Sequence, residues 1–226
     1  MNIMTLKNTE IITEIIPISN KKGYSMSLVT VQNKQNAQYK MDKLTEILRG
    51  LLTEVLSHSV RVANIADMLA KQVDDIPDGL SMAAYSHSIW LGCLYHHIGE
   101  SSCNDTDADQ LPQHNIAVLN KHLEIIENKS HINKDIVFDI VRNYHERSNI
   151  NTSLAARLAG FADTLDELFV DCFTDIDMKI CQVEQFIQNK GEELFGSDVI
   201  ECFVAVREDI YKYFAVHHEN NTEDFQ

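Results

Sequence analysis

The chain has 226 residues, of which 44% are hydrophobic and 23% are charged, and its formal net charge is −15. This length and apolar content predict one folded domain, alone or with a small appendage, and exclude a largely disordered chain. The negative charge disfavours nucleic acid polymers and anionic membrane surfaces as partners.

The first part of the chain differs from the rest in charge and in pattern. Residues 1–40 carry five lysines and two glutamates, and the segments 11–16 and 25–31 are β-branched or alternating. A turn-forming cluster at 19–23 separates them, so residues 1–35 are predicted to form a β-hairpin extension. An isolated hairpin is only marginally stable. We therefore expect it to pack on the helical body, on a second copy in a homodimer, or on a signalling-protein partner.

Residues 36–218 are predicted to form an all-α domain. Apolar residues recur there at three- and four-residue spacing, and the chain has only 8 glycines and 3 prolines to break helices. After a helical region from 36 to 69, the predicted helices cover 78–97, 114–127, 136–144, 154–169, 178–189 and 198–214. Residues 101–113 are predicted to be a polar loop, and 219–226 a disordered tail.

Residues 80–99 contain no Asp, Glu, Lys or Arg, but they contain three serines and three histidines. We interpret this stretch as a buried core helix rather than a membrane span, and expect no membrane association. Five cysteines form no CxxC pair, which predicts reduced thiols in a cytoplasmic protein. The N-terminus lacks the apolar segment of a signal peptide.

Seven side chains of the types that bind hard metals follow one another along the predicted helices. They are Glu54, His58, His96, His97, His114, His145 and Asp163. Imidazole and carboxylate together suit Fe, Mn or Zn, and four or more converging ligands are needed to hold an ion. No member is decisive alone, because a histidine at the end of an apolar helix is more often a core or capping residue. The metal-site prediction therefore depends on the ordered set.

The local setting of these residues adds to the argument. Glu54 and His58 are four residues apart and share one helix face. His96 and His97 close a long apolar helix. Asp163 lies among small apolar residues, where a carboxylate is costly unless it is paired or metal-bound. A functional role is therefore favoured for Asp163.

Five stretches resemble the HD superfamily of metal-dependent phosphohydrolases, and within it the HD-GYP group. In chain order they are 58–63, 94–100, 114–117, 144–147 and 155–168. The resemblance implies an all-helical, HD-GYP-like bundle around a metal site. It also implies hydrolysis of a phosphodiester, typically cyclic di-GMP or a related cyclic dinucleotide, and hence a small anionic nucleotide ligand.

The resemblance also implies particular site residues. Those that match family metal ligands by position are Glu54, His58, His96, His114, His145 and Asp163. The implied cofactor is a divalent metal, with Fe or Mn expected first and Zn or Ni as alternatives. Arg147 is the candidate for substrate binding, and no catalytic residue is assigned.

The chain departs from the family pattern at several positions. His97 stands where the family has aspartate, Tyr144 replaces the first histidine of a pair, Glu100 replaces a lysine, and the Gly-Tyr-Pro loop is absent. A carboxylate can bridge two metals through its two oxygens, whereas neutral imidazole has one free lone pair. We therefore expect one tightly held metal, through His58, His96 and Asp163 with His97 in support. A glutamate near a phosphate is repulsive, so turnover of cyclic di-GMP is expected to be slow or absent.

Three functions remain open from the sequence. The first is a metal-dependent phosphodiesterase, which the surviving ligands favour. The second is a catalytically degenerate HD-GYP-like signalling or binding module, which the departures favour. The third is an iron-dependent oxidase, because some HD-type folds bind two irons and use O2.

Overall fold

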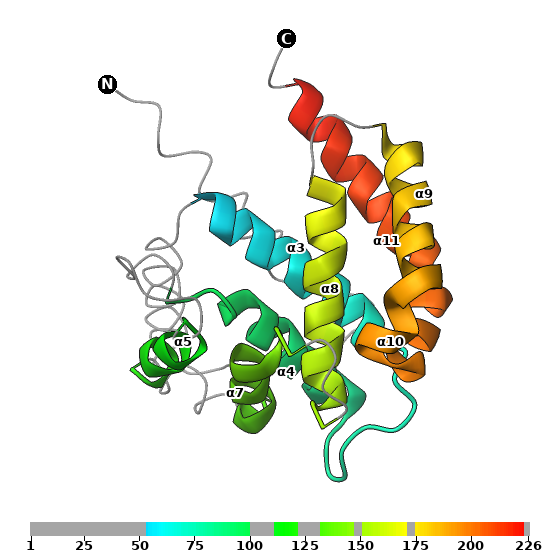
Figure 1. The fold of residues 1–226 in the computed structure, drawn as a ribbon. Helices are drawn as coiled ribbons and strands as arrows, with labels where there is room; N and C mark the ends of the chain where they lie inside the picture. The colour runs from blue at the N-terminus through cyan, green and yellow to red at the C-terminus, as the bar shows by residue number, and fades with distance from the viewer. Residues whose placement is uncertain (1–52, 100–110, 122–131, 147–150, 171–174, 224–226) are drawn as a thin grey trace, which may run out of the picture. The chain divides into compact units, whose positions relative to one another are not determined.

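The computed structural model describes residues 53–99, 111–121, 132–146, 151–170 and 175–223, all within one compact unit that spans residues 44–226. Every regular element in these residues is helical (Figure 1). In chain order the elements are α3 (Thr53–Ala70), α4 (Met82–Tyr95), α5 (Leu111–Asn120), α7 (Lys134–Asn143), α8 (Leu154–Val170), α9 (Ile176–Phe186), the π-helix η3 (Ile187–Gly191), α10 (Glu192–Phe195) and α11 (Ser197–Glu223). The all-α prediction is confirmed for this part of the chain. The hairpin predicted for 1–35 lies outside the described residues.

Capping residues determine where the helices begin. The helix predicted from residue 78 starts four residues later, because Gly79 has a positive φ of 82° and Ser81 caps α4 by accepting a hydrogen bond from the Ala84 amide at 3.2 Å. Asn133 caps α7 by accepting from two backbone amides. At the other end of the chain, α11 continues through residue 223, into the segment that the sequence assigned to a tail.

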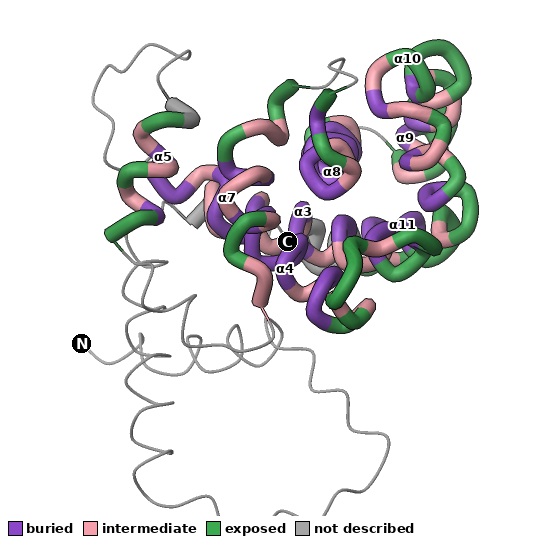
Figure 2. Tube along the Cα trace, turned by 90° about the horizontal axis from the view of Figure 1, so that it is seen from below, coloured by how far each residue is buried: buried purple, intermediate pink, exposed green. Residues whose placement is uncertain are grey.

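Helices α3, α4 and α8 form the centre of the domain. Helix α3 packs against both α4 and α8, and α8 also contacts α7 together with α9, α10 and α11. Nearly all of α4 is buried, as Figure 2 shows, and side chains such as Ile65, Leu94 and Leu165 are fully inaccessible. Burying one such side chain contributes about 1.5–3 kcal/mol. Within the described residues, no helix is both long and apolar enough to cross a bilayer.

Two close contacts place α8 relative to its neighbours. A Cβ at Gly160 would lie 2.3 Å from the backbone oxygen of Tyr144, so the end of α7 approaches α8 at a point where only glycine fits. Arg157 on α8 forms a paired contact with Asp198, at 2.6 Å for each nitrogen–oxygen distance, and also donates to the Phe195 carbonyl. These contacts fix the helix that carries Asp163.

Candidate metal centre

Four of the seven predicted ligands come together at the centre of the bundle. One ligand-type atom from each of His58, His96, His97 and Asp163 lies within 4.8 Å of the others. His58 comes from α3 and Asp163 from α8, while the two consecutive histidines follow the last residue of α4. Two imidazoles and a carboxylate, with a third imidazole beside them, make a donor set that suits a divalent transition metal. We call this group the His/Asp cluster.

His96 gives the clearest indication that the cluster suits a cation. Its side chain is 1% exposed, and its Nδ1 donates to the Cys93 carbonyl, which leaves a lone pair on Nε2. That buried Nε2 has no hydrogen-bond partner and lies 3.6 Å from Asp163 Oδ1. Burial lowers the pKa of His96 to about 4, so the ring is neutral at pH 7. A lone pair that faces a carboxylate is repulsive, and a metal ion between them would remove the repulsion.

Asp163 remains ionised although it is almost completely buried. Burial alone would raise the pKa of its carboxyl group, but the contact with protonated His58 opposes this effect, and the pKa is held well below its usual range. The nearest contact is His58 Nε2, 3.1 Å from Asp163 Oδ1. The cluster therefore contains a permanent negative charge that a cation can neutralise.

His58 lies between two carboxylates. Its Nε2 faces Asp163, and its Nδ1 is 2.7 Å from Asp166 Oδ2. Burial alone would lower the pKa of His58, but the two aspartates together raise it to about 9. The metal-free ring is therefore protonated at neutral pH. A metal bound at Nε2 would take the place of one of its protons.

His97 and Tyr144 complete the wall of the cluster. The ring centres of His96 and His97 are 3.8 Å apart, and the Tyr144 hydroxyl is 3.5 Å from His97 Nδ1, at the long end of hydrogen-bond distance. The Tyr144 ring meets both imidazoles edge-on, at 4.8 Å from His96 and 5.7 Å from His97. The phenol therefore occupies space beside the two histidines.

The remaining predicted ligands lie elsewhere or beyond the described side chains. His114 on α5 is partly buried and His145 is 44% exposed, and neither belongs to the group within 4.8 Å. His145 Nε2 instead lies 3.8 Å from a carboxylate oxygen of Glu146. Glu54 is on the first turn of α3, but its side chain lies outside the described part. Glu100 and Arg147 also lie outside it.

The structure adds three residues that the sequence did not single out. Arg61 contacts Asp166 through Nε at 2.6 Å and Nη2 at 2.9 Å. Asn115 on α5 donates to the His96 carbonyl at 2.6 Å and accepts from the Gly99 amide at 2.8 Å. Arg61 and Asp166 each lie three residues after a cluster residue, a spacing that puts them on the same helix face. This three-residue spacing could have pointed to Arg61 and Asp166 in the sequence.

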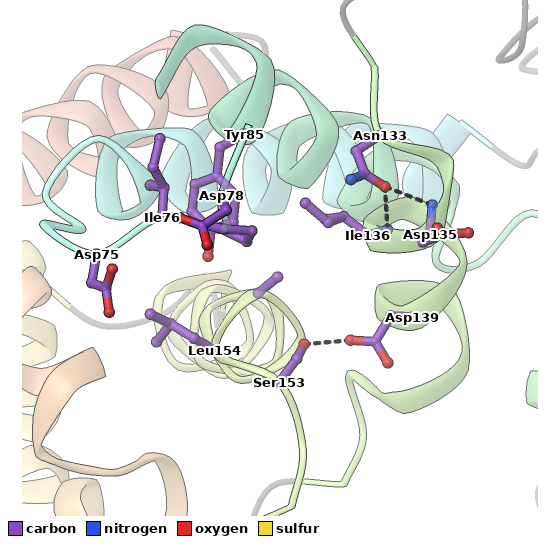
Figure 3. A pocket seen from close by; sticks show the side chains of 12 residues that line it. Asp75, Ile76, Asp78, Tyr85, Asn133, Asp135, Ile136, Asp139, Ser153 and Leu154 are labelled. Atoms are coloured by element: carbon purple, nitrogen blue, oxygen red, sulfur yellow. Dashed lines mark hydrogen bonds between the residues drawn. The ribbon is translucent and has the colours of Figure 1, made fainter. Parts of the chain in front are cut away.

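A hollow of about 490 Å³ lies apart from the cluster, at the N-terminal ends of α4, α7 and α8 (Figure 3). Its lining includes four aspartates, Asp75, Asp78, Asp135 and Asp139. None of the described residues that line it is a lysine or an arginine. No member of the His/Asp cluster lines it. Four carboxylates repel an anionic ligand such as phosphate, so the His/Asp cluster, and not this hollow, is the candidate functional site.

Comparison with known proteins identifies the family. The HD domain family model matches residues 55–168, just over half of the chain, and this span contains the entire His/Asp cluster. The chain belongs to the HD domain family. Neither curated proteins nor solved structures gave a match. The protein is thus an all-α HD domain whose His/Asp cluster could hold a divalent metal.

Proposed function

We propose that the protein is a metal-dependent phosphohydrolase-type domain that holds one divalent metal through His58, His96 and Asp163, with His97 in support. The observation that carries this proposal is the buried, unpartnered Nε2 of His96 facing Asp163. Fe or Mn is the first choice of metal because the family resemblance implies it, and a donor set of imidazoles and a carboxylate suits either. Zn and Ni are the alternatives.

The charge of the site supports an anionic substrate. Asp163 and Asp166 are negative and Arg61 is positive, so these groups carry one net negative charge when the histidines are neutral. A divalent ion would reverse this to one net positive charge, which attracts a phosphate. When bound, such an ion supplies Lewis acidity toward a phosphoryl oxygen. The imidazoles and Asp163 would hold it.

The substrate class that we propose is a cyclic dinucleotide or a related phosphoester, processed slowly. His97 cannot bridge two metals as a carboxylate can, and the other two predicted histidines lie outside the group within 4.8 Å. These features favour one metal and disfavour the efficient hydrolysis expected of an HD-GYP enzyme.

Metal analysis and a turnover assay with cyclic di-GMP test this function together. We expect about one metal per chain, loss of metal in Asp163→Ala, and turnover well below about 1 s⁻¹, the lower end of ordinary enzymes. A wild-type protein that takes up no Fe, Mn, Zn or Ni would refute the metal site. Turnover at or above about 1 s⁻¹ would show that the departures at His97 and Tyr144 do not impair catalysis.

A degenerate signalling module is the second candidate. The observation that favours it is the presence of His97 where the family pattern has a bridging carboxylate, with Tyr144 packed against it. Such a module would bind a small anionic nucleotide without cleaving it. Calorimetry with cyclic di-GMP on the metal-loaded protein distinguishes the two: binding without product favours the module, and product formation favours the hydrolase.

A further inference from the structure

We infer that Asp166 and Arg61 form a positioning pair that holds His58 with its Nδ1 protonated and its Nε2 turned toward the metal. This inference rests on the proposed metal site. Asp166 and Arg61 lie outside the His/Asp cluster, and their proposed role is to keep His58 oriented as a metal ligand. The relevant contacts are His58 Nδ1 to Asp166 Oδ2 at 2.7 Å and Arg61 to both oxygens of Asp166.

The helix geometry explains why these residues meet. His58 and Arg61 are three residues apart on α3, and Asp163 and Asp166 are three residues apart on α8. Residues at this spacing share one helix face, and the two faces pack together in the core. His58 is thereby placed between the two carboxylates, with one ring nitrogen directed at each.

The contact at Nδ1 determines what Nε2 can do. A neutral imidazole carries its single proton on one nitrogen and a lone pair on the other. Because Asp166 accepts a hydrogen bond from Nδ1, the ring keeps that proton and would release the one on Nε2, beside Asp163, when a metal binds. This is the arrangement in which metal-binding histidines are usually oriented by a carboxylate on the far side of the ring.

Arg61 fixes the orientation of that carboxylate. Asp166 is 1% exposed and lies one helical turn from Asp163, so an unpaired Asp166 would add a second buried negative charge to the site. The guanidinium neutralises it and, by contacting Oδ1 and Oδ2 through two different nitrogens, sets the plane of the carboxylate. Oδ2 is then directed at His58.

Asp166→Asn is the informative substitution because an amide cannot satisfy both neighbours. If its oxygen faces His58, its NH2 group opposes the Nε–H of Arg61. If its oxygen faces Arg61, its NH2 group opposes Nδ1 of His58 and favours the tautomer with the proton on Nε2, where the metal would bind. Either orientation should weaken metal binding.

The test measures Zn²⁺ affinity by competition with a chromophoric chelator, using the full chain. Asp166→Asn should weaken Zn²⁺ binding by about 10- to 100-fold without lowering the stoichiometry at saturation. Arg61→Gln should act in the same direction, and Arg61→Lys should fall between Arg61→Gln and the wild type, because an ammonium keeps the charge but loses the two-nitrogen contact.

The chain supplies a matched control in Arg157 and Asp198. This pair also joins α8 to another helix through two short contacts, but it does not touch the His/Asp cluster. Asp198→Asn should lower the urea midpoint while leaving Zn²⁺ affinity within about twofold of the wild type. Equal losses of Zn²⁺ affinity in Asp198→Asn and Asp166→Asn would show a general structural effect and overturn the inference.

A second measurement does not depend on the folding of any variant. Long-range 15N NMR spectra of the Zn²⁺-loaded wild type should show His58 with a proton on Nδ1 and the metal on Nε2. Coordination through Nδ1, or wild-type affinity in Asp166→Asn, would overturn the positioning role while the metal site stands. A wild-type protein that binds none of Zn²⁺, Fe²⁺, Mn²⁺ and Ni²⁺ would instead overturn the proposed metal site, and this inference with it.

Discussion

The metal-free protein should lose stability between pH 6.5 and pH 9 because of one residue. Burial alone would lower the pKa of His58, but the two flanking aspartates raise it from its ordinary 6.5 to about 9. A base whose pKa is raised by folding stabilises the folded state fully below its unfolded pKa, and this contribution is lost as pH rises through the folded pKa. The difference corresponds to about 3 kcal/mol.

A loss of that size is measurable, since domains are typically stable by only about 5–15 kcal/mol. Urea unfolding in the presence of a chelator, at pH 6.5 and pH 9, gives the free energy of unfolding at each pH. The wild type should lose about 3 kcal/mol more than His58→Gln over this interval, because the variant lacks the titrating group. His145→Gln, at an exposed histidine, should behave as the wild type. Equal losses in the wild type and His58→Gln would refute the assignment of this stability to His58.

Three further substitutions, the last with a control variant, test other parts of the structure. His97→Asp should raise metal stoichiometry from about one toward two, since a carboxylate can bridge two ions; metal analysis showing two tight ions in the wild type would contradict this. Asp163→Ala should abolish metal binding, and full loading of that variant would refute the ligand assignment. Gly160→Ala should cost about 1–3 kcal/mol in urea unfolding, because the added methyl group meets the Tyr144 backbone. Gly191→Ala should cost less, because there the methyl group meets a movable isoleucine side chain.

The sequence predicted the helical class and most of the helix positions because burial imposes a periodicity that can be read directly. Helix ends were less accurate, since they depend on local hydrogen bonds. Gly79 and Ser81 together delay the start of α4, and the start of α5 at Leu111 falls inside the predicted loop. The loop was predicted from polarity alone, and polarity does not indicate the residue at which a helix begins.

Part of the His/Asp cluster could be predicted from the sequence, and the residues that support it were not predicted. His96 and Asp163 stand out in the sequence because buried polar groups among apolar residues require a partner. Arg61 and Asp166 were missed because an arginine and an aspartate far apart in sequence look like solvated charges until the packing of α3 against α8 brings them together. For the same reason, spacing alone could not tell that His145 would be exposed.

The turn after α4 has a consequence for engineering. Consecutive residues in a regular helix project in directions about 100° apart, whereas His96 and His97 follow the end of α4 and both reach the cluster. Asn115, from α5, donates a hydrogen bond to the His96 carbonyl and accepts one from the Gly99 amide, at the two ends of this turn. Exchanging α5 for the equivalent segment of another HD domain would therefore replace the brace that aligns two ligands, even though α5 contributes no residue to the cluster. Grafted versions of this domain should keep α4, its turn and Asn115 as one unit.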